Sequence, residues 1–260
     1  MPEIFVTPEW VAAARTNSTV VDVRREDQYS EGHLPGAVNI PFDRFRDPTG
    51  EMEGKLPTPM DFASLLSEAG IASNDRIVAY DGDHGVYASR FLVTARVFGH
   101  DLDQLYLLNG DFDNWARTHR TTLTVPTTRA TDYTCQRRSG DPLVGASELE
   151  EALGTDAVIV DTRDPLEYDV VHLPGAVNFQ WRSLIDGETG QLKPRTEKEV
   201  VLEAHEITPD RPIRLYCNTA RRLSFVYAVL RELGYDDVAF YEGGIDAWAE
   251  YGGPFETTPS

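Results

Sequence analysis

The sequence contains the stretch Val21-Asp22-Val23-Arg24, followed a short way on by His33-Leu34-Pro35-Gly36-Ala37-Val38-Asn39. The same pair of segments returns as Val160-Asp161-Thr162-Arg163 and His172-Leu173-Pro174-Gly175-Ala176-Val177-Asn178. Both segments recur at one offset of 139 residues, since Asp22 matches Asp161 and His33 matches His172. Agreement over this length at a single offset indicates an internal duplication, so the chain is expected to contain two copies of one structural unit.

Each copy alternates short apolar segments with amphipathic ones. This alternation predicts an α/β fold in which each unit has a mostly parallel sheet with helices on both faces. The expected strands are 20–23, 77–80, 104–108, 157–161, 213–216 and 238–241, and the expected helices are 59–69, 87–98, 147–153, 197–205 and 224–233. A stretch rich in Thr and Arg, without periodicity, separates the copies. We therefore expect a first domain over 1–122, a linker over 123–142 and a second domain over 143–260.

The composition is that of a globular protein, with 41% hydrophobic and 10% aromatic residues in a chain of 260. No apolar run reaches the roughly 18 residues that a membrane span needs. The first residues lack the basic region and apolar core of a secretion signal. The chain has two cysteines, Cys135 and Cys217, and a protein with so few usually keeps them reduced. Together these features favour the cytoplasm.

The net charge of −19 argues against nucleic acid as a partner, because such surfaces need basic patches. Only Lys55, Lys193 and Lys198 are lysines, and the other basic residues are arginines. Carboxylates are spread through the whole chain. This balance is typical of proteins from salt-loving organisms, in which concentrated salt screens the self-repulsion.

Cys217 offers the most complete chemical site in the sequence. The expected strand 213–216 ends at this cysteine, and the expected helix begins at Ser224. Ligands of open parallel sheets bind beyond the carboxyl ends of strands, and unpaired amides at a helix start favour an anion. Arg221 and Arg222 add positive charge beside the thiol. These features predict that Cys217 is a nucleophile that acts as its thiolate.

Together these motifs resemble the rhodanese family in its tandem form. The resemblance rests on the Asp-x-Arg and His-Leu-Pro-Gly-Ala-Val-Asn motifs of both copies, on the cysteine loop, and on the closing Gly243-Gly244 with Trp248. It implies two rhodanese-like domains, of which the second is catalytic. In the first copy Asp81 stands where the second has Cys217, so the resemblance implies that the first domain has lost its nucleophile.

The resemblance implies a sulfurtransferase that moves sulfur from thiosulfate to cyanide or a thiol through a persulfide on Cys217. The loop residues that would bind the anionic donor are Asn218, Thr219, Ala220, Arg221 and Arg222. The loop matches neither of the two best-known family signatures, and Ala220 replaces a frequent glycine. A preference for 3-mercaptopyruvate therefore stays open. No cofactor is implied, and no metal-ligand cluster or nucleotide motif is present.

Asp161, Arg163 and His172 are attractive as acid–base groups, but the first copy keeps their counterparts while lacking the cysteine. We interpret them as structural supports that brace the loops, in particular through a buried Asp–Arg pair.

Two other functions compete with a sulfurtransferase. Related phosphatases have five residues between cysteine and arginine, whereas Cys217 and Arg222 have four between them. A non-catalytic sulfur-binding or regulatory module is the alternative of another class.

Overall fold

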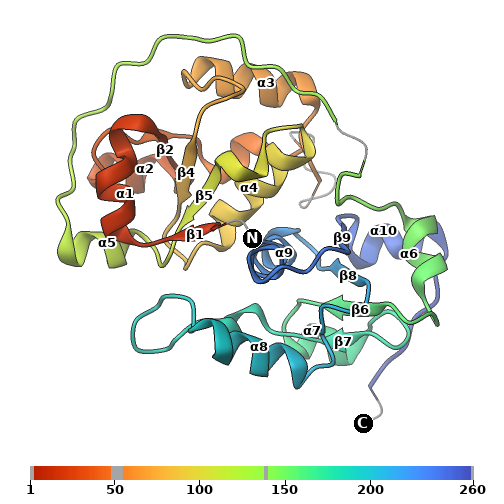
Figure 1. The fold of residues 1–260 in the computed structure, drawn as a ribbon. Helices are drawn as coiled ribbons and strands as arrows, with labels where there is room; N and C mark the ends of the chain where they lie inside the picture. The colour runs from red at the N-terminus through yellow and green to blue at the C-terminus, as the bar shows by residue number, and fades with distance from the viewer. Residues whose placement is uncertain (1–2, 48–54, 138–139, 259–260) are drawn as a thin grey trace.

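The computed structural model describes residues 3–47, 55–137 and 140–258. Figure 1 shows two α/β units, one above the other, with helices α4 (Val86–Val97) and α9 (Arg221–Leu233) between their sheets. The other helices are α1 (Pro8–Ala14), α2 (Glu26–Glu31), α3 (Pro59–Glu68), α5 (Phe112–Thr118), α6 (Ala146–Ala152), α7 (Pro165–Val170), α8 (Arg195–Glu203) and α10 (Gly244–Tyr251). Short 3₁₀ turns cover Arg15–Asn17, Phe42–Phe45, Leu102–Gln104 and Trp181–Leu184.

The first sheet has five parallel strands in the order β1-β5-β4-β2-β3. They are β1 (Phe5–Val6), β2 (Thr19–Asp22), β3 (Val38–Asn39), β4 (Ile77–Tyr80) and β5 (Leu105–Leu108). All four residues of β4 are buried, as expected for a central strand covered on both faces. The carboxyl end of β4 is Tyr80, so Asp81 begins the loop that follows it.

The second sheet has four parallel strands in the order β7-β6-β8-β9. They are β6 (Val158–Asp161), β7 (Val177–Asn178), β8 (Ile213–Tyr216) and β9 (Val238–Tyr241). Beyond β9 a single parallel bridge joins Leu143 to Phe240, where the first sheet has β1 beside β5. Register pairs Tyr216 with Asp161 on one side and with Tyr241 on the other. Cys217 therefore follows an interior strand at its carboxyl end.

The duplicated sequence folds twice into the same arrangement, which confirms the predicted α/β class. All six expected strands are present with shifts of about one residue at their ends. The two-residue strands and the helices α1, α2, α5, α7 and α10 were not predicted, because elements of this length leave little periodic pattern. One boundary was wrong in a way that matters for the site: α9 begins at Arg221, three residues before the expected Ser224. Both arginines thus belong to its first turn.

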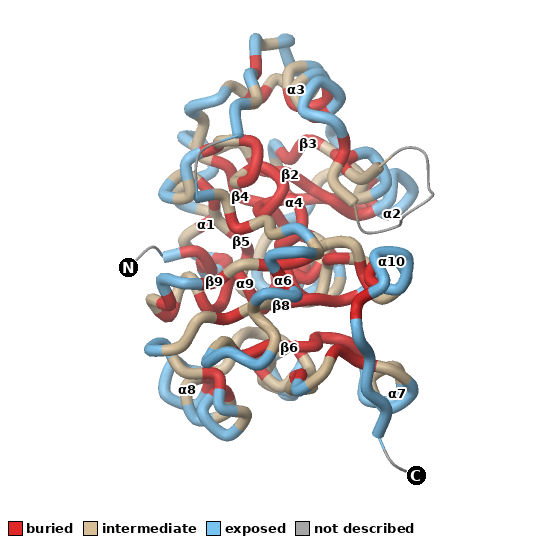
Figure 2. The backbone as a smooth tube through the Cα atoms, turned by 90° about the vertical axis from the view of Figure 1, so that its right-hand side faces the viewer, coloured by how far each residue is buried: buried red, intermediate tan, exposed pale blue. Residues whose placement is uncertain are grey.

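The two domains share one hydrophobic core, which continues across α4 and α9 (Figure 2). Phe5 of the first domain packs edge-on against Phe225 of α9, with ring centroids 5.6 Å apart. Polar contacts reinforce the interface: Glu232 on α9 accepts from the amide of Phe5 at 2.8 Å, and Arg90 on α4 pairs with Glu242 at 2.7 Å. These apolar and polar contacts hold the two domains against each other, so a cleft between them has defined walls.

The segment expected to be a linker lies along the outside of the first domain, as the green trace in Figure 1 shows. The amide of Tyr133 donates to Ser67 Oγ at 2.9 Å, and the amide of Gln136 donates to the carbonyl of Phe98 at 2.8 Å. Residues 138–139 of the expected linker lie outside the described residues. Tyr133 itself is buried in the core. The domain limits at 122 and 143 stay predictions.

Candidate active site

Cys217 lies at the carboxyl end of β8 and is fully buried. The end of β8 pairs with the end of β6, where Asp161 lies beside Tyr216. Arg163 makes a bidentate ion pair with Asp161, with Nη2 and Oδ2 2.6 Å apart. Thr162 Oγ1 donates to the carbonyl of Tyr216 at 3.2 Å. Burial and the nearby Asp161 carboxylate raise the pKa of Tyr216, so its hydroxyl stays protonated and accepts from the amide of Leu173 at 3.1 Å.

The loop between Cys217 and α9 turns through Ala220, whose φ of 54° lies in the left-handed region. A left-handed residue lets the chain reverse and start a helix at once, but a side chain with Cβ costs roughly 1 kcal/mol there. Ala220 is the N-cap of α9 and makes no side-chain cap. The helix consequently begins with uncapped amides directed at the loop.

The backbone amides of residues 218–223 donate no hydrogen bond to any residue in the described ranges. Unpaired amides around one loop form a concave donor site for an anion, and the positive end of the helix dipole adds to it. Since Cys217 begins this loop, negative charge on its sulfur or on an attached sulfur atom would meet these donors.

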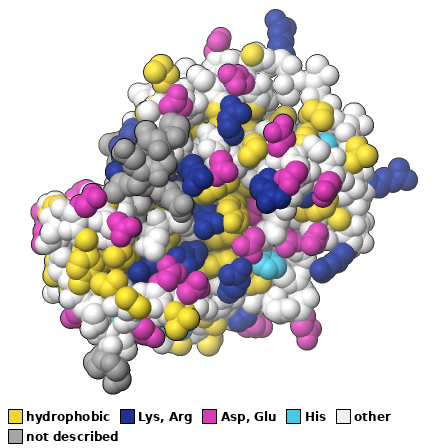
Figure 3. Space-filling model, turned by 180° about the vertical axis from the view of Figure 1, so that it is seen from behind, with side chains coloured by type: hydrophobic (Ala, Val, Ile, Leu, Met, Phe, Trp, Pro, Cys, Tyr) yellow, Lys and Arg dark blue, Asp and Glu magenta, His cyan; other side chains and the backbone are white. Residues whose placement is uncertain are grey.

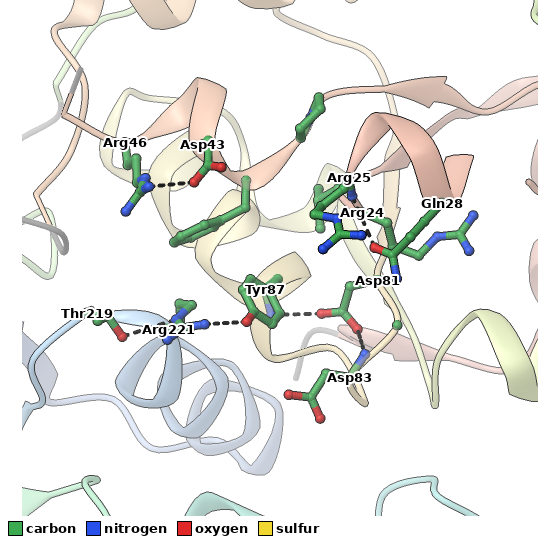
Figure 4. Close-up of a pocket in the computed structure, with 14 residues that line it drawn as sticks. Arg24, Arg25, Gln28, Asp43, Arg46, Asp81, Asp83, Tyr87, Thr219 and Arg221 are labelled. Carbon is green, nitrogen blue, oxygen red and sulfur yellow. Dashed lines mark hydrogen bonds and ion pairs between the residues drawn. The ribbon is translucent and has the colours of Figure 1, made fainter. Parts of the chain in front are cut away.

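The first domain shows what fills such a loop when no cysteine is present. Asp81 Oδ1 accepts from the amides of Asp83 and Gly85, each at 2.8 Å. Its Oδ2 accepts from the amides of Tyr87 at 2.7 Å and Ala88 at 2.9 Å. Figure 4 shows this carboxylate turned toward its own loop. Burial raises the pKa of Asp81, and the four amide donors oppose that shift. The carboxylate thus occupies the place that an anionic ligand would take.

Arg222 is held by carboxylates of α7 and its cap. Its guanidinium donates to Glu167 at 2.7 and 3.2 Å and to Asp164 at 3.2 Å. Glu167 Oε1 also accepts from Asn218 Nδ2 at 3.0 Å, so one carboxylate holds two residues of the catalytic loop. Burial is the largest single influence and would raise the pKa of Glu167, but the hydrogen bonds from Arg222 and the Asp164 amide, together with the charges of Arg222 and Arg163, outweigh it, so the pKa is lowered.

Arg221 points to the first domain instead. Its Nε donates to Thr219 Oγ1 at 3.1 Å, and Nη1 donates to the hydroxyl of Tyr87 (Figure 4). The guanidinium carbon lies 4.6 Å from the centre of the Tyr87 ring and 5.6 Å from that of Phe42. Arg221 therefore ties the catalytic loop to the wall that the first domain contributes.

The three predicted supports are all buried and hydrogen-bonded in the structure. Asp161 and Arg163 form the pair described above, and the first domain repeats it with Asp22 and Arg24, whose Oδ2 and Nη2 are 2.7 Å apart. His172 stacks on Tyr168 with ring centroids 3.8 Å apart, and its Nδ1 lies 2.8 Å from the Tyr168 carbonyl oxygen. These contacts agree with a bracing role.

A cavity of about 400 Å³ lies between the domains at the catalytic loop. It is lined by Asn218, Thr219, Arg221 and Arg222 from the loop and α9, by Asp164, Glu167, Trp181 and Arg182 from the second domain, and by Asp83 and Val86 from the first. Cys217 does not line this cavity, in keeping with the full burial of its side chain.

Sequence reasoning missed two residues that shape the site. Glu167 holds Asn218 and Arg222. Its position shortly after Arg163, close to the end of β6, was the sequence signal that placed it near the loop. Gly244 lies against the loop: a Cβ there would stand 3.2 Å from Asn218 Cα and 3.4 Å from the Cys217 carbonyl oxygen. Its φ of +68° also requires glycine.

Comparison with known sequences identifies the family. The sequence profile of the rhodanese-like domain matches residues 7–118 and again residues 145–251. The chain belongs to the rhodanese family. The thiosulfate sulfurtransferase of Azotobacter vinelandii is 32% identical over 248 residues, covering 90% of this chain and 87% of that protein. The thiosulfate sulfurtransferase of Pseudomonas aeruginosa is 31% identical over 251 residues, with the same two coverages.

Solved rhodanese structures share the fold. The crystal structure of the 3-mercaptopyruvate sulfotransferase SseA from Escherichia coli superposes with a TM-score of 0.83 at 24% identity. The superposition covers 92% of this chain and 98% of that one, so both rhodanese domains are matched. The tandem arrangement inferred from the repeat is confirmed.

Two features of the described residues concern membranes and metal ions. No helix of 3–47, 55–137 or 140–258 is long and apolar enough to cross a membrane. Within the same ranges, no group of three or more His, Cys, Asp or Glu side chains is arranged to hold a metal ion.

Proposed function

We propose that this rhodanese is a thiosulfate sulfurtransferase that carries the transferred sulfur as a persulfide on Cys217. The observation that supports this most strongly is the contrast between the two loops. The amides of the Asp81 loop are filled by a carboxylate, whereas those around Cys217 are unpaired in the described chain. A loop that keeps its donors open beside a cysteine suits an anion attached to that cysteine.

In the first half-reaction the Cys217 thiolate attacks the outer sulfur of thiosulfate. The S–S bond of the donor breaks, sulfite leaves with its electron pair, and Cys217 holds a persulfide anion. Arg222 borders the cavity at the loop and draws the dianion toward it. The amides of residues 218–223 stabilise the charge on the outer sulfur as it transfers.

In the second half-reaction an acceptor attacks the outer sulfur of the persulfide. Cyanide leaves as thiocyanate, and a thiolate acceptor leaves as a new persulfide. In both cases the bond between the outer sulfur and Cys217 Sγ breaks and the Cys217 thiolate returns. Asn218, Thr219 and Ala220 shape the loop that holds the intermediate, while Asp161, Arg163 and His172 brace it.

The donor 3-mercaptopyruvate is the second candidate, and the fold shared with the Escherichia coli 3-mercaptopyruvate sulfotransferase favours it. The two arginines at the cavity, Arg221 and Arg222, favour thiosulfate instead, because this small dianion carries more negative charge than the carboxylate of mercaptopyruvate. Side-by-side kcat/KM values at high salt decide between the two. A preference for mercaptopyruvate of about tenfold, roughly 1.4 kcal/mol in the transition state, would reverse the assignment.

The test of the enzyme function compares the two cysteines. Cys217→Ser should lose thiosulfate:cyanide activity and the gain of one sulfur atom in intact mass after incubation with thiosulfate. Cys135→Ser should retain both. Equal activity of the Cys217 variant and the parent would instead favour the non-catalytic module.

We further propose a cytoplasmic location and adaptation to high salt. The net charge of −19 produces self-repulsion that concentrated salt would screen. The midpoint of thermal unfolding should therefore rise steadily with added KCl over the molar range. A flat response would remove the halophilic part of this proposal and leave the sulfur chemistry untouched.

A further inference from the structure

A second cavity, of about 460 Å³, lies in the first domain beside the catalytic loop (Figure 4). Its wall includes Thr219 and Arg221, which also line the cavity at the catalytic loop. The volume is within the range of small-molecule sites and far larger than thiosulfate needs. A ligand held here would therefore lie next to the loop without competing for the place of the donor.

The cavity wall is rich in arginine in a chain that is strongly acidic overall, although Arg24, Arg25 and Arg46 each pair with an aspartate. It carries four arginines, Arg24, Arg25, Arg46 and Arg221, against three aspartates, Asp43, Asp81 and Asp83. The Asp81 carboxylate is occupied by the amides of its own loop, and Asp83 pairs with Arg182 at 3.0 Å. Asp43 pairs with Arg46 at 2.6 Å. Figure 3 shows dark-blue side chains gathered around a hollow on the face seen from behind.

One arginine nitrogen on this wall has no hydrogen-bond partner in the described chain. The Arg24 side chain is 6% exposed, and its Nε and Nη2 bind Asp22 and the Gly32 carbonyl. Its Nη1 donates to no residue of the described chain. Nη2 of Arg221 is likewise without a hydrogen bond in the described ranges. Because Arg24 and Arg221 both line the cavity, these two nitrogens are available to an acceptor on a ligand held there.

The aromatic part of the wall limits the kind of ligand. Phe42 and Tyr87 meet edge-on with centroids 5.2 Å apart, and Arg46 and Arg221 lie over Phe42 at 5.5 and 5.6 Å. A site of this kind suits an organic anion with an apolar portion, and a carboxylate is a planar group that the arginine fork matches.

We propose that this cavity binds the sulfur acceptor and that the acceptor is a small thiol bearing carboxylates. The proposal rests on the proposed function. The acceptor thiolate attacks the outer sulfur of the Cys217 persulfide, forming a new S–S bond, and the Cys217 thiolate leaves. The first domain, having lost its own nucleophile, would then serve the second by holding its co-substrate.

The kinetic test compares mercaptosuccinate with 2-mercaptoethanol as acceptors and thiosulfate as donor. In the parent, mercaptosuccinate should have the higher kcat/KM. Arg46→Gln should lower the ratio of the two kcat/KM values about tenfold, the size of one charge-assisted hydrogen bond. Arg44→Gln is the matched control, because Arg44 lies on the 3₁₀ turn that Arg46 directly follows but does not line this cavity. An unchanged ratio in Arg46→Gln would overturn the proposal.

A binding test separates this proposal from the sulfur chemistry. Succinate, which has no thiol, should bind the parent and Arg44→Gln in calorimetry and bind Arg46→Gln about tenfold more weakly. If the parent had no thiosulfate:cyanide activity but bound succinate in this pattern, the proposed function would fail and the carboxylate site would stand. Normal activity with no succinate binding, or with equal binding in all three proteins, would remove the site alone.

Discussion

Glu167 holds Arg222 through hydrogen bonds of 2.7 and 3.2 Å and at the same time accepts from Asn218 at 3.0 Å. One carboxylate of α7 therefore positions the first and last residues of the loop that follows Cys217. It also offsets the charge of Arg222, the arginine that we propose attracts thiosulfate. Loss of positioning and loss of charge offset would change the KM for thiosulfate in opposite directions, so a single isosteric substitution separates them.

Replacing Glu167 with Gln keeps a hydrogen-bond acceptor for Asn218 and removes the negative charge. We expect the KM for thiosulfate to fall about threefold, because the dianion then meets an arginine whose charge is less offset. The effect should shrink as KCl is added. Glu206→Gln, at an exposed pair remote from the cleft, is the control. A rise in KM would mean that Glu167 acts mainly by positioning.

The same pair predicts a pH dependence of stability. Because the pKa of Glu167 is lowered in the folded protein, its contribution is present above the ordinary glutamate value of about 4.3 and is lost as the pH falls through the lowered pKa. The parent should exceed Glu167→Gln by about 1 kcal/mol or less in unfolding free energy at pH 7. Urea titrations at descending pH should show the difference vanish. A constant difference down to pH 2 would contradict the ion pair.

Asp81 should be a stability residue of the first domain. Asp81→Ala leaves four loop amides without their acceptor, and we expect a loss of about 3 kcal/mol in the free energy of unfolding. Asp83→Ala, which removes only the exposed pair with Arg182, should cost less than about 1 kcal/mol. Urea denaturation measures both, and similar small losses would refute the assigned role of the carboxylate.

Ala220 adopts a backbone conformation that glycine accepts more easily. Ala220→Gly should raise the unfolding free energy by about 0.5 kcal/mol, since relief of the left-handed strain exceeds the added entropy of the unfolded chain. Ala228→Gly, in the middle of α9, should lower it by about 1 kcal/mol. Thermal unfolding of the two variants should shift in opposite directions, and a shift of both downward would count against strain at Ala220.

Gly244 should matter for activity more than for folding. In Gly244→Ala the new Cβ would press on Asn218 and on the Cys217 carbonyl, so we expect kcat/KM for thiosulfate to fall at least about tenfold. Gly252→Ala is a close control, because that glycine has a φ of +87° with nothing near its added Cβ. Comparable kinetics in the two variants would show that only backbone strain is at work.

The two thiols should differ in alkylation. Burial raises the pKa of Cys135 to about 11, so at pH 7.5 only a minute fraction is thiolate. Iodoacetamide should modify Cys217 first, with peptide mapping as the readout, and thiosulfate should protect that residue alone. Faster labelling of Cys135 would contradict the assignment of Cys217 as the reactive thiol.

The sequence was sufficient for features that local pattern and repetition encode. The duplicated Asp-x-Arg and His-Leu-Pro-Gly segments predicted two α/β units, and the loss of cysteine at Asp81 predicted which copy keeps the chemistry. Apolar runs of four residues located the central strands within a residue. Such features depend on near neighbours along the chain, so their signal is visible without a structure.

Only the tertiary structure decided which residues the charged side chains of the site contact. The directions taken by Arg221, toward Tyr87, and by Arg222, toward Glu167, depend on side chains far away in sequence. The same holds for Gly244, which lies against the loop from the start of another helix, and for the basic cavity that joins both domains. Contacts across large sequence separations are set by packing of whole elements, and no local pattern records them. The sequence thus predicted the nucleophile, and the fold determined what surrounds it.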